Sequence, residues 1–112
     1  MPGHQITLAA EGDLRGIWRY TLDSWGPEQA DRYLDQIEDC LDAIGDGRVR
    51  SRSFQRLPDG VCVHRCQHHY IFWFVIDVPV IIAVLHEKMD VVQRLSDRLY
   101  WPASRVSWHF LT

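Results

Sequence analysis

Apolar residues recur at steps of three and four along two stretches in the first half of the chain, which is typical of amphipathic helices. The first stripe consists of Ala10, Leu14, Ile17, Trp18, Thr21 and Trp25, and the second of Ala30, Tyr33, Leu34, Ile37, Leu41 and Ile44. Gly26-Pro27 separates them, and proline suits the first position of a new helix. Gly45 and Gly47 then end the second helix. Because the break is so short, we expect the two helices to form an antiparallel hairpin.

The pattern changes after Asp46. Residues 47–60 are polar and rich in arginine, and they end in the turn signal Pro58-Asp59-Gly60. Runs of β-branched and aromatic residues then predict strands over residues 61–67, 70–76 and 80–85, with a turn at residues 77–79. Residues 4–8 are a further, short extended candidate.

A last amphipathic helix follows the strands. Asp90 is placed to cap it, and Gln93 is placed to complete a capping box. Its apolar side consists of Val91, Val92, Leu95 and Leu99, and Trp101-Pro102 ends it. In the tail, Val106, Trp108 and Phe110 alternate with polar residues, which predicts either one more short strand or an extended packed segment.

These elements predict the order β-α-α-β-β-β-α in a single domain over residues 1–112. The expected fold class is α+β, with an N-terminal strand and the helical hairpin packed on one face of an antiparallel sheet, followed by a C-terminal helix and an extended tail. A nucleotide site is not expected, since the pattern predicts neither a parallel sheet nor a glycine-rich turn from strand to helix.

The composition is that of an ordinary globular protein, with 46% hydrophobic and 24% charged residues. No apolar stretch approaches the roughly 20 residues that span a bilayer. The N-terminus lacks the basic region and apolar segment of a secretory signal. Three cysteines, Cys40, Cys62 and Cys66, in a chain without a signal favour reduced thiols. We therefore expect a soluble cytoplasmic protein.

Charge is unevenly distributed along the chain, although the net charge is only −3. Residues 11–46 have a local balance of −7, whereas residues 47–70 have a balance of +4. The basic residues of the second segment are Arg48, Arg50, Arg52, Arg56 and Arg65. Such segregation indicates either a charged surface for a partner or a solvated loop.

Cys62, His64, Cys66 and His68 alternate along one predicted strand, which would place four zinc-ligand types on one face. The first and last of them would be about 20 Å apart, too far for one tetrahedral ion. Cysteines on a sheet face are more often small buried apolar residues. Neighbours on one strand are also too far apart for a direct hydrogen bond between nucleophile and base, so no cysteine nucleophile is predicted. No metal and no cofactor are expected.

His86 lies where the last strand leads into the final helix, in the segment from Val84 to Asp90. A histidine there suits general acid–base chemistry near neutral pH. The alternative is that His86 hydrogen-bonds backbone at the strand end while Asp90 caps the helix.

Four groups of residues in chain order carry a family resemblance. The first two are Ala10, Asp13-Leu14, Ile17 and Tyr20, and then Trp25-Gly26, Gln29-Ala30, Tyr33 and Ile37. The last two are Arg65, His69, Ile71 and Phe72-Trp73, and then Val84-Leu85-His86, Met89-Asp90 and Arg94-Leu95. Together they resemble the RelE/ParE toxin superfamily, and its ParE branch most closely, over roughly residues 5–96.

The resemblance implies the toxin of a type II toxin–antitoxin system. ParE toxins bind and poison DNA gyrase, and ParD antitoxins cover them with a C-terminal segment. RelE relatives instead cut mRNA on the ribosome with basic residues and a C-terminal tyrosine or histidine. Here a net charge of −3, with Lys88 as the single lysine, suits RNA binding poorly. We therefore expect a gyrase inhibitor without catalysis. The alternatives are an endoribonuclease that uses Arg65 and His86, and a non-toxic relative that only binds an antitoxin.

The resemblance also suggests where partners bind. We expect the antitoxin in a groove lined by Trp18, Trp25 and Trp73, and its carboxylates on the arginine-rich segment, Arg48, Arg50, Arg52 and Arg56. Target contacts in the ParE branch involve the C-terminal region, where the candidates are Arg94, Arg98 and Trp101. The expected assembly is a hetero-oligomer of toxin and antitoxin, without a membrane and without direct sequence-specific nucleic-acid binding.

Overall fold

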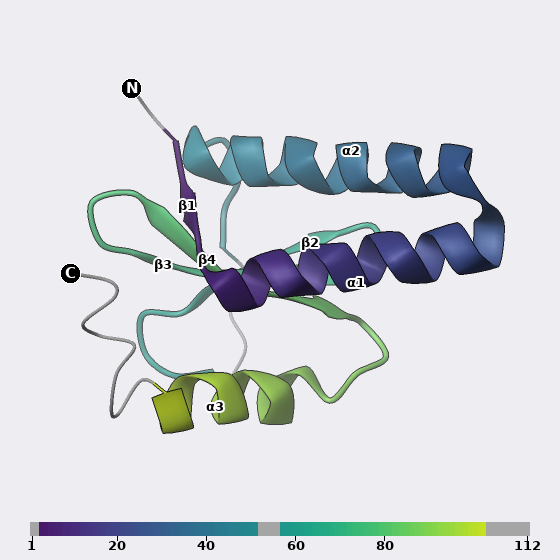
Figure 1. Ribbon diagram of the computed structural model, residues 1–112. Helices are drawn as coiled ribbons and strands as arrows, with labels where there is room; N and C mark the ends of the chain where they lie inside the picture. Colours follow the sequence, from purple (N-terminus) through teal and green to yellow (C-terminus); the bar gives the residue numbers. More distant parts are fainter. Residues whose placement is uncertain (1–2, 52–56, 103–112) are drawn as a thin grey trace.

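The protein is described by a computed structural model over residues 3–51 and 57–102. Its elements are β1 (Gln5–Ile6), α1 (Leu8–Trp25), α2 (Pro27–Gly45), β2 (Cys62–Cys66), β3 (His69–Val75), β4 (Pro79–His86) and α3 (Val91–Pro102). Figure 1 shows α1 and α2 as an antiparallel pair, with α2 at the top and α1 in front of the strands, and α3 at the bottom. The predicted order and the α+β fold class are thus confirmed, whereas the extended segment predicted around residues 106–110 lies outside the described residues.

The junction of the two long helices depends on one glycine. Gly26 has a φ of 92°, in the left-handed region that glycine enters without strain. Its N–H donates to the carbonyl of Leu22 at 2.9 Å, which ends α1, and its own carbonyl accepts from Ala30 N–H at 3.1 Å, which begins α2. Pro27 takes the first position of α2, as predicted. The hairpin is therefore closed by local backbone chemistry.

The capping of α3 follows the prediction only in part. The carboxylate of Asp90 accepts a hydrogen bond from Gln93 N–H at 3.1 Å, so the predicted cap is confirmed. The Gln93 amide does not return to the cap, because it donates to the Asp97 carboxylate at 2.8 Å, one turn further along the helix. The predicted capping box is therefore wrong in its second half.

The sheet has the order β1-β4-β3-β2. β2, β3 and β4 form the predicted antiparallel meander, but β1 pairs with β4 in parallel, at Gln5↔Val80 and Ile6↔Ile81. β1 is only two residues long, because the Thr7 side chain already accepts from Ala10 N–H at 3.1 Å and starts α1. The prediction of a sheet without parallel strands was therefore wrong for this one pair.

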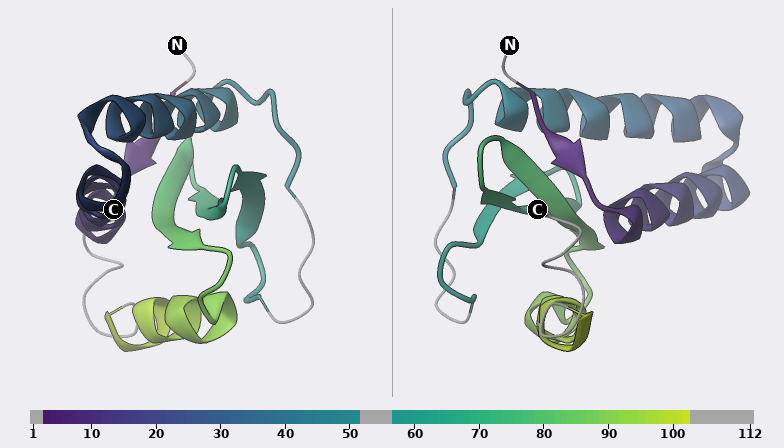
Figure 2. Two further views of the ribbon diagram at one scale, coloured as in Figure 1. Left: turned by 90° about the vertical axis from the view of Figure 1, so that its right-hand side faces the viewer. Right: turned by 60° about the vertical axis from the view of Figure 1, so that its left-hand side comes forward.

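Both faces of the sheet are covered. The pairing of β3 with β4 changes register between Phe72 and Trp73. Phe72 pairs with Ala83 and Trp73 pairs with Ile81, so Ile82 is an extra, unpaired residue that forms a β-bulge. On one face Ile81 packs in the cluster beneath the α1–α2 hairpin; on the other, Ile82 packs with Leu95 of α3. Figure 2 shows α2 and α3 on opposite sides of the strands. Residues 80–85 of β4 are consequently all buried.

A disulfide joins Cys40 of α2 to Cys66 of β2, whereas Cys62 is a free thiol. The expectation of three reduced thiols is therefore wrong for this pair. The cause is tertiary: α2 crosses the sheet over the end of β2, and spacing along the chain does not reveal that contact.

Candidate partner-binding site

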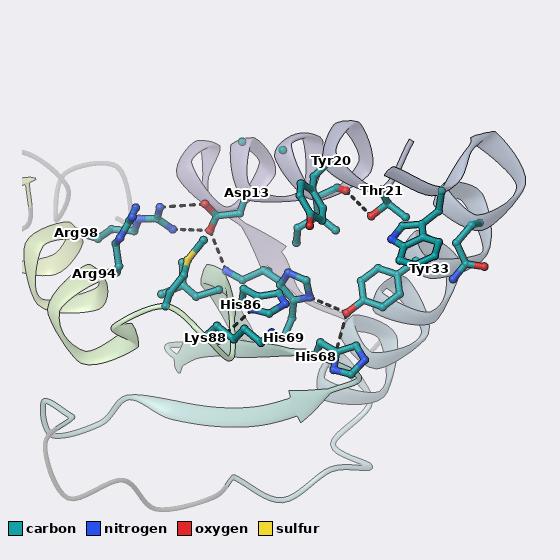
Figure 3. Close-up of a pocket in the computed structure, with 18 residues that line it drawn as sticks. Asp13, Tyr20, Thr21, Tyr33, His68, His69, His86, Lys88, Arg94 and Arg98 are labelled. Atoms are coloured by element: carbon teal, nitrogen blue, oxygen red, sulfur yellow. Dashed lines mark hydrogen bonds and ion pairs between the residues drawn. The ribbon is translucent and has the colours of Figure 1, made fainter. Parts of the chain in front are cut away.

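A groove runs between α1, the end of β4 and the start of α3, and it reaches Gln29 and Tyr33 of α2 (Figure 3). We call it the α1–α3 groove. Its volume is about 820 Å³. The side chains and glycines used below are Gly12, Gly16 and Tyr20 from α1, His86 at the end of β4, Lys88 and Met89 after it, and Arg94 and Arg98 from α3.

One end of this groove is closed by an ion pair between α1 and α3. The Asp13 carboxylate accepts from both terminal nitrogens of Arg98, at 2.6 and 3.0 Å. Asp13 also accepts from Val84 N–H at 2.9 Å, and Arg98 donates to the carbonyl of Ile82 at 3.1 Å. Because β1 pairs only with residues 80 and 81, it does not reach the carbonyl of Ile82 or the N–H of Val84. The Arg98 and Asp13 side chains supply the hydrogen-bond partners of these two backbone groups instead. Arg98, predicted to contact the target, is thus engaged within the chain.

On the other side of the β4 end, α2 is tied to the turn between β2 and β3. Tyr33 Oη accepts from His68 N–H at 3.1 Å and lies 2.7 Å from His69 Nδ1. The Tyr33 O–H donates to Nδ1 when the proton of neutral His69 is on Nε2, and Tyr33 Oη accepts from Nδ1 when the proton is on Nδ1. We call Tyr33, Cys40, Cys66, His68 and His69 the α2 joint.

Burial explains the titration behaviour of the α2 joint. His69 is only 8% exposed, and burial, assisted by nearby His86 and His68, lowers its pKa to about 4. Burial also raises the pKa of Tyr33. His69 is therefore neutral at physiological pH.

The two residues proposed for a ribonuclease have different surroundings. Arg65 lies on β2, where its guanidinium pairs with Glu87 and donates to the carbonyl of Gln67. A hydrogen bond from His68, together with Arg65, lowers the pKa of Glu87. His86 lines the groove, and its Nδ1 accepts from Lys88 N–H at 3.0 Å. The structure thus bears out the backbone-bonding alternative for His86 and leaves Arg65 already neutralised by a carboxylate.

The predicted aromatic contacts divide into two sets. Trp25 is 73% exposed and Trp18 is 38% exposed, with its indole N–H donating to the Asp31 carboxylate at 3.2 Å. Trp73 is only 4% exposed and packs in the core beneath the helical hairpin. The prediction that Trp73 lines an exposed groove is therefore wrong, because β3 is a central strand covered on both faces.

The charged candidates are placed as follows. Arg48 pairs with Asp46 at 3.0 Å on the surface, and Arg50 is exposed. Arg52 and Arg56 lie outside the described residues. Arg94 lines the groove, and Trp101 belongs to the last turn of α3. Among the described residues, no three histidine, cysteine or acidic side chains are grouped to hold a metal ion.

Sequence reasoning missed several residues of the groove and the joint. Gly12 and Gly16 could have been found from the sequence. They are four residues apart inside a predicted helix, where glycine lowers helix stability, so their presence there requires an explanation. Asp13, Tyr33 and His69 entered only as residues that carry the family resemblance, without a predicted role. Their roles arise from contacts between residues 36 to 85 positions apart.

Comparison with known proteins identifies the class of protein that carries this fold and groove. The family described as "ParE toxin of type II toxin-antitoxin system, parDE" matches residues 5–91. Toxin ParE of Escherichia coli is 37% identical over 101 residues, covering 88% of this chain and 98% of the relative. Toxin ParE1 of Mycobacterium tuberculosis is 30% identical over 95 residues, covering 80% and 94%.

A solved chain described as "Chromosomal ParDE TA system from P. aeruginosa" superposes with a TM-score of 0.67 at 18% identity, covering 77% of this chain and 96% of that one. At that identity the likeness concerns the fold alone. The family match and the relatives together define a toxin of a type II toxin–antitoxin system. The chain belongs to the ParE toxin family, as the resemblance of its sequence predicted.

Proposed function

We propose that this toxin acts by binding DNA gyrase, without catalysis of its own, and that a ParD-like antitoxin neutralises it by covering its surface. Membership of the ParE family over residues 5–91 is the observation that carries the proposal. Such a target would place its action inside the cell. Among the described helices, none is long and apolar enough to cross a bilayer.

The pairing of Asp13, Arg65 and Tyr33 with other side chains supports binding over catalysis at these residues. A metal-independent ribonuclease needs a base, an acid and free cations that converge on one phosphate. Here the Asp13 carboxylate binds Arg98, the Arg65 guanidinium binds Glu87, and Tyr33 binds His69. These groups form ion pairs or hydrogen bonds with one another within the chain, so they stabilise the fold.

Exposed features on the helical hairpin support an antitoxin contact there. Trp18 and Trp25 are seven residues apart on α1 and therefore lie on one stripe of the helix. Exposed aromatic residues of this kind are common anchors at interfaces. We expect Arg48, Arg50, Arg52 and Arg56 to meet carboxylates of the same antitoxin.

The gyrase proposal is tested with purified toxin, DNA gyrase, ATP and supercoiled plasmid, in parallel with translating ribosomes. We expect cleaved plasmid in the first assay, reversed by an excess of the antitoxin encoded beside the toxin gene. Codon-dependent mRNA cleavage in the second assay would establish a ribonuclease instead. Inactivity in both would show a relative that binds its antitoxin only.

The arginine contacts are tested by salt. If carboxylates of the antitoxin face these arginines, raising NaCl from about 0.05 to 0.5 M should weaken the complex, because screening shortens the reach of exposed charges. The variant R48Q/R50Q should show a smaller salt dependence. Affinity that does not change with salt would remove this part of the proposal.

A further inference from the structure

The Cys40–Cys66 disulfide belongs to a toxin whose proposed target lies inside the cell. The chain has three cysteines, so this is the one internal disulfide that it can hold. Small thiols keep cysteines reduced in most cytoplasms, and the disulfides that do form there are usually transient, catalytic or redox-sensing. A disulfide in this setting is therefore one that opens and closes.

The fold accommodates the reduced pair as well as the oxidised pair. Cys66 Sγ lies 3.5 Å from the carbonyl oxygen of Gln36, so a reduced Cys66 has an acceptor in place for its S–H. Other contacts of α2 do not depend on the disulfide: Tyr33 accepts from His68 N–H, and Ile37 packs in the core beneath the hairpin. Reduction thus removes a covalent link without removing these contacts.

The two bonded sulfurs differ in their access to solvent. Cys66 is only 3% exposed, whereas Cys40 is half-buried on α2. A small thiol or disulfide in solution therefore reacts at Cys40, because exchange requires direct approach to a sulfur atom. The free thiol of Cys62 lies four residues before Cys66 on β2, about 13 Å along the strand, which is too far for it to attack Cys66.

The disulfide supports the turn between β2 and β3. Gln67 in this turn has a φ of 57°, in the left-handed region that residues other than glycine enter at a cost. Helix α2 holds the turn on both sides of Gln67, through the disulfide to Cys66 and through Tyr33, which binds His68 N–H. With the disulfide reduced, hydrogen bonds and apolar packing alone hold α2 to the turn, so the α2 joint opens more often.

We propose that Cys40 and Cys66 form a reversible redox switch, which exchanges with small thiols and disulfides of the glutathione class and sets the lifetime of the free toxin. In oxidation, the Cys40 thiolate attacks a glutathione-class disulfide, forms a mixed disulfide and releases one small thiol. The Cys66 thiolate then attacks the Cys40 sulfur and releases the second small thiol. The two cysteine protons end on the two released thiols, and reduction reverses both steps.

The switch acts on stability and leaves the partner surfaces unchanged. Neither Cys40 nor Cys66 lines the α1–α3 groove, and Trp18 and Trp25 lie on α1. A reduced toxin released from its antitoxin therefore opens and is degraded quickly, whereas an oxidised toxin persists. The biological role of the switch rests on the proposed action inside the cell.

The first test is a redox titration of purified full-length toxin in mixtures of reduced and oxidised glutathione, followed by alkylation of free thiols and mass spectrometry. At about 10 mM total glutathione, the disulfide fraction should pass through one half between ratios of about 1:1 and about 1000:1, reduced to oxidised. Cys62→Ser should titrate in the same way. A disulfide that stays intact at the most reducing ratio, or that does not form at the most oxidising one, overturns the proposal.

The second test is digestion of native toxin by a limiting amount of protease in the two end mixtures. Digestion follows the population of opened chain, so the half-life should be about tenfold or more shorter in the reducing mixture. Cys62→Ser should show the same change, and Cys40→Ser should have a short half-life in both mixtures. Equal half-lives for the wild type and Cys62→Ser in the two mixtures overturn the proposal, whether or not Cys40→Ser folds.

The gyrase assay, run with undigested toxin in both mixtures, separates this proposal from the proposed function. Plasmid cleavage should agree within about threefold, since the switch leaves the partner surfaces unchanged. No cleavage in either mixture, with half-lives that still depend on redox state, would remove the gyrase target and retain the switch. Cleavage with half-lives that do not depend on redox state would retain the target and remove the switch.

Discussion

The α2 joint borders the α1–α3 groove, since Tyr33, His68 and His69 also line that groove, and both regions contain aromatic and polar side chains. In the joint these groups meet one another: Tyr33 bridges His68 and His69, and Cys40 is bonded to Cys66. In the groove, Lys88 and Arg94 form no ion pair among the described residues, Tyr20 is exposed, and two glycines leave the helix backbone bare.

The difference separates residues that contact one another within the fold from residues whose side chains make few contacts within the described chain. A substitution in the joint removes an internal contact and should lower stability. A substitution in the groove removes a contact that the free toxin does not make, so it should leave stability unchanged or raise it. Composition and residue type alone do not distinguish the two regions, but the contacts do.

The largest expected effect in the joint comes from the disulfide. Reduction should lower the free energy of unfolding by about 3.5 kcal/mol, since Cys40 and Cys66 are 26 residues apart and the crosslink restricts the unfolded chain. Urea unfolding with and without a phosphine reductant measures this. Cys62→Ser should retain the full effect of reductant, whereas Cys40→Ser should abolish it. Equal stability in both redox states would contradict the role of this crosslink.

His69 should make the fold sensitive to acid. Its pKa is about 4 in the folded chain against 6.5 when exposed, so the unfolded state binds more protons between these values. The stability that neutral His69 contributes is therefore present above pH 6.5 and is lost as the pH falls to about 4, by up to about 3 kcal/mol. Unfolding of wild type and His69→Gln across this range measures the difference, and parallel curves would count against it.

The ion pair at the closed end of the groove is an internal contact, and it should behave like the joint. Asp13→Ala should cost about 2–3 kcal/mol, because it leaves the partly buried Arg98 and the Val84 N–H without their acceptor. Asp46→Ala, which breaks the exposed pair with Arg48, should cost less than about 0.5 kcal/mol. Similar losses in the two variants would show that Asp13 does not anchor α3.

The smallest expected effects on stability come from two Tyr→Phe substitutions, one in the joint and one in the groove. Tyr33→Phe should cost about 1–2 kcal/mol, since its hydroxyl bridges His68 N–H and His69 Nδ1. Tyr20→Phe should change stability by less than about 0.5 kcal/mol, because Tyr20 is 70% exposed in the groove. A loss in Tyr20→Phe as large as that in Tyr33→Phe would erase the distinction between the two regions.

The elements that sequence predicted correctly are those fixed by local chemistry. Gly26-Pro27 sets the hairpin junction, Asp90 caps α3, and the apolar periods identify the helices and the meander. Contacts between distant segments could not be read in this way. The parallel pairing of β1, the Cys40–Cys66 bond and the burial of Trp73 all depend on which elements become neighbours.

The candidate site shows the same division. Trp18 and Trp25 are exposed, and Arg94, predicted as a target contact, lines the groove, whereas Arg98, predicted for the same role, is bound by Asp13. The sequence does not reveal that the Arg98 guanidinium forms an ion pair with a carboxylate 85 positions away. Only the glycines of α1 pointed to the groove from the sequence. Glycine destabilises a helix, so two glycines in one helix indicate a packing or binding role.

The separation of joint from groove is tested most directly by NMR, with isotope-labelled toxin titrated with unlabelled antitoxin from the neighbouring gene. We predict that backbone signals of Gly12, Gly16, Tyr20, Lys88 and Arg94 shift on binding, while those of Cys40 and Cys66, which do not line the groove, keep their positions. Large shifts in the α2 joint with an unperturbed α1–α3 groove would contradict the account.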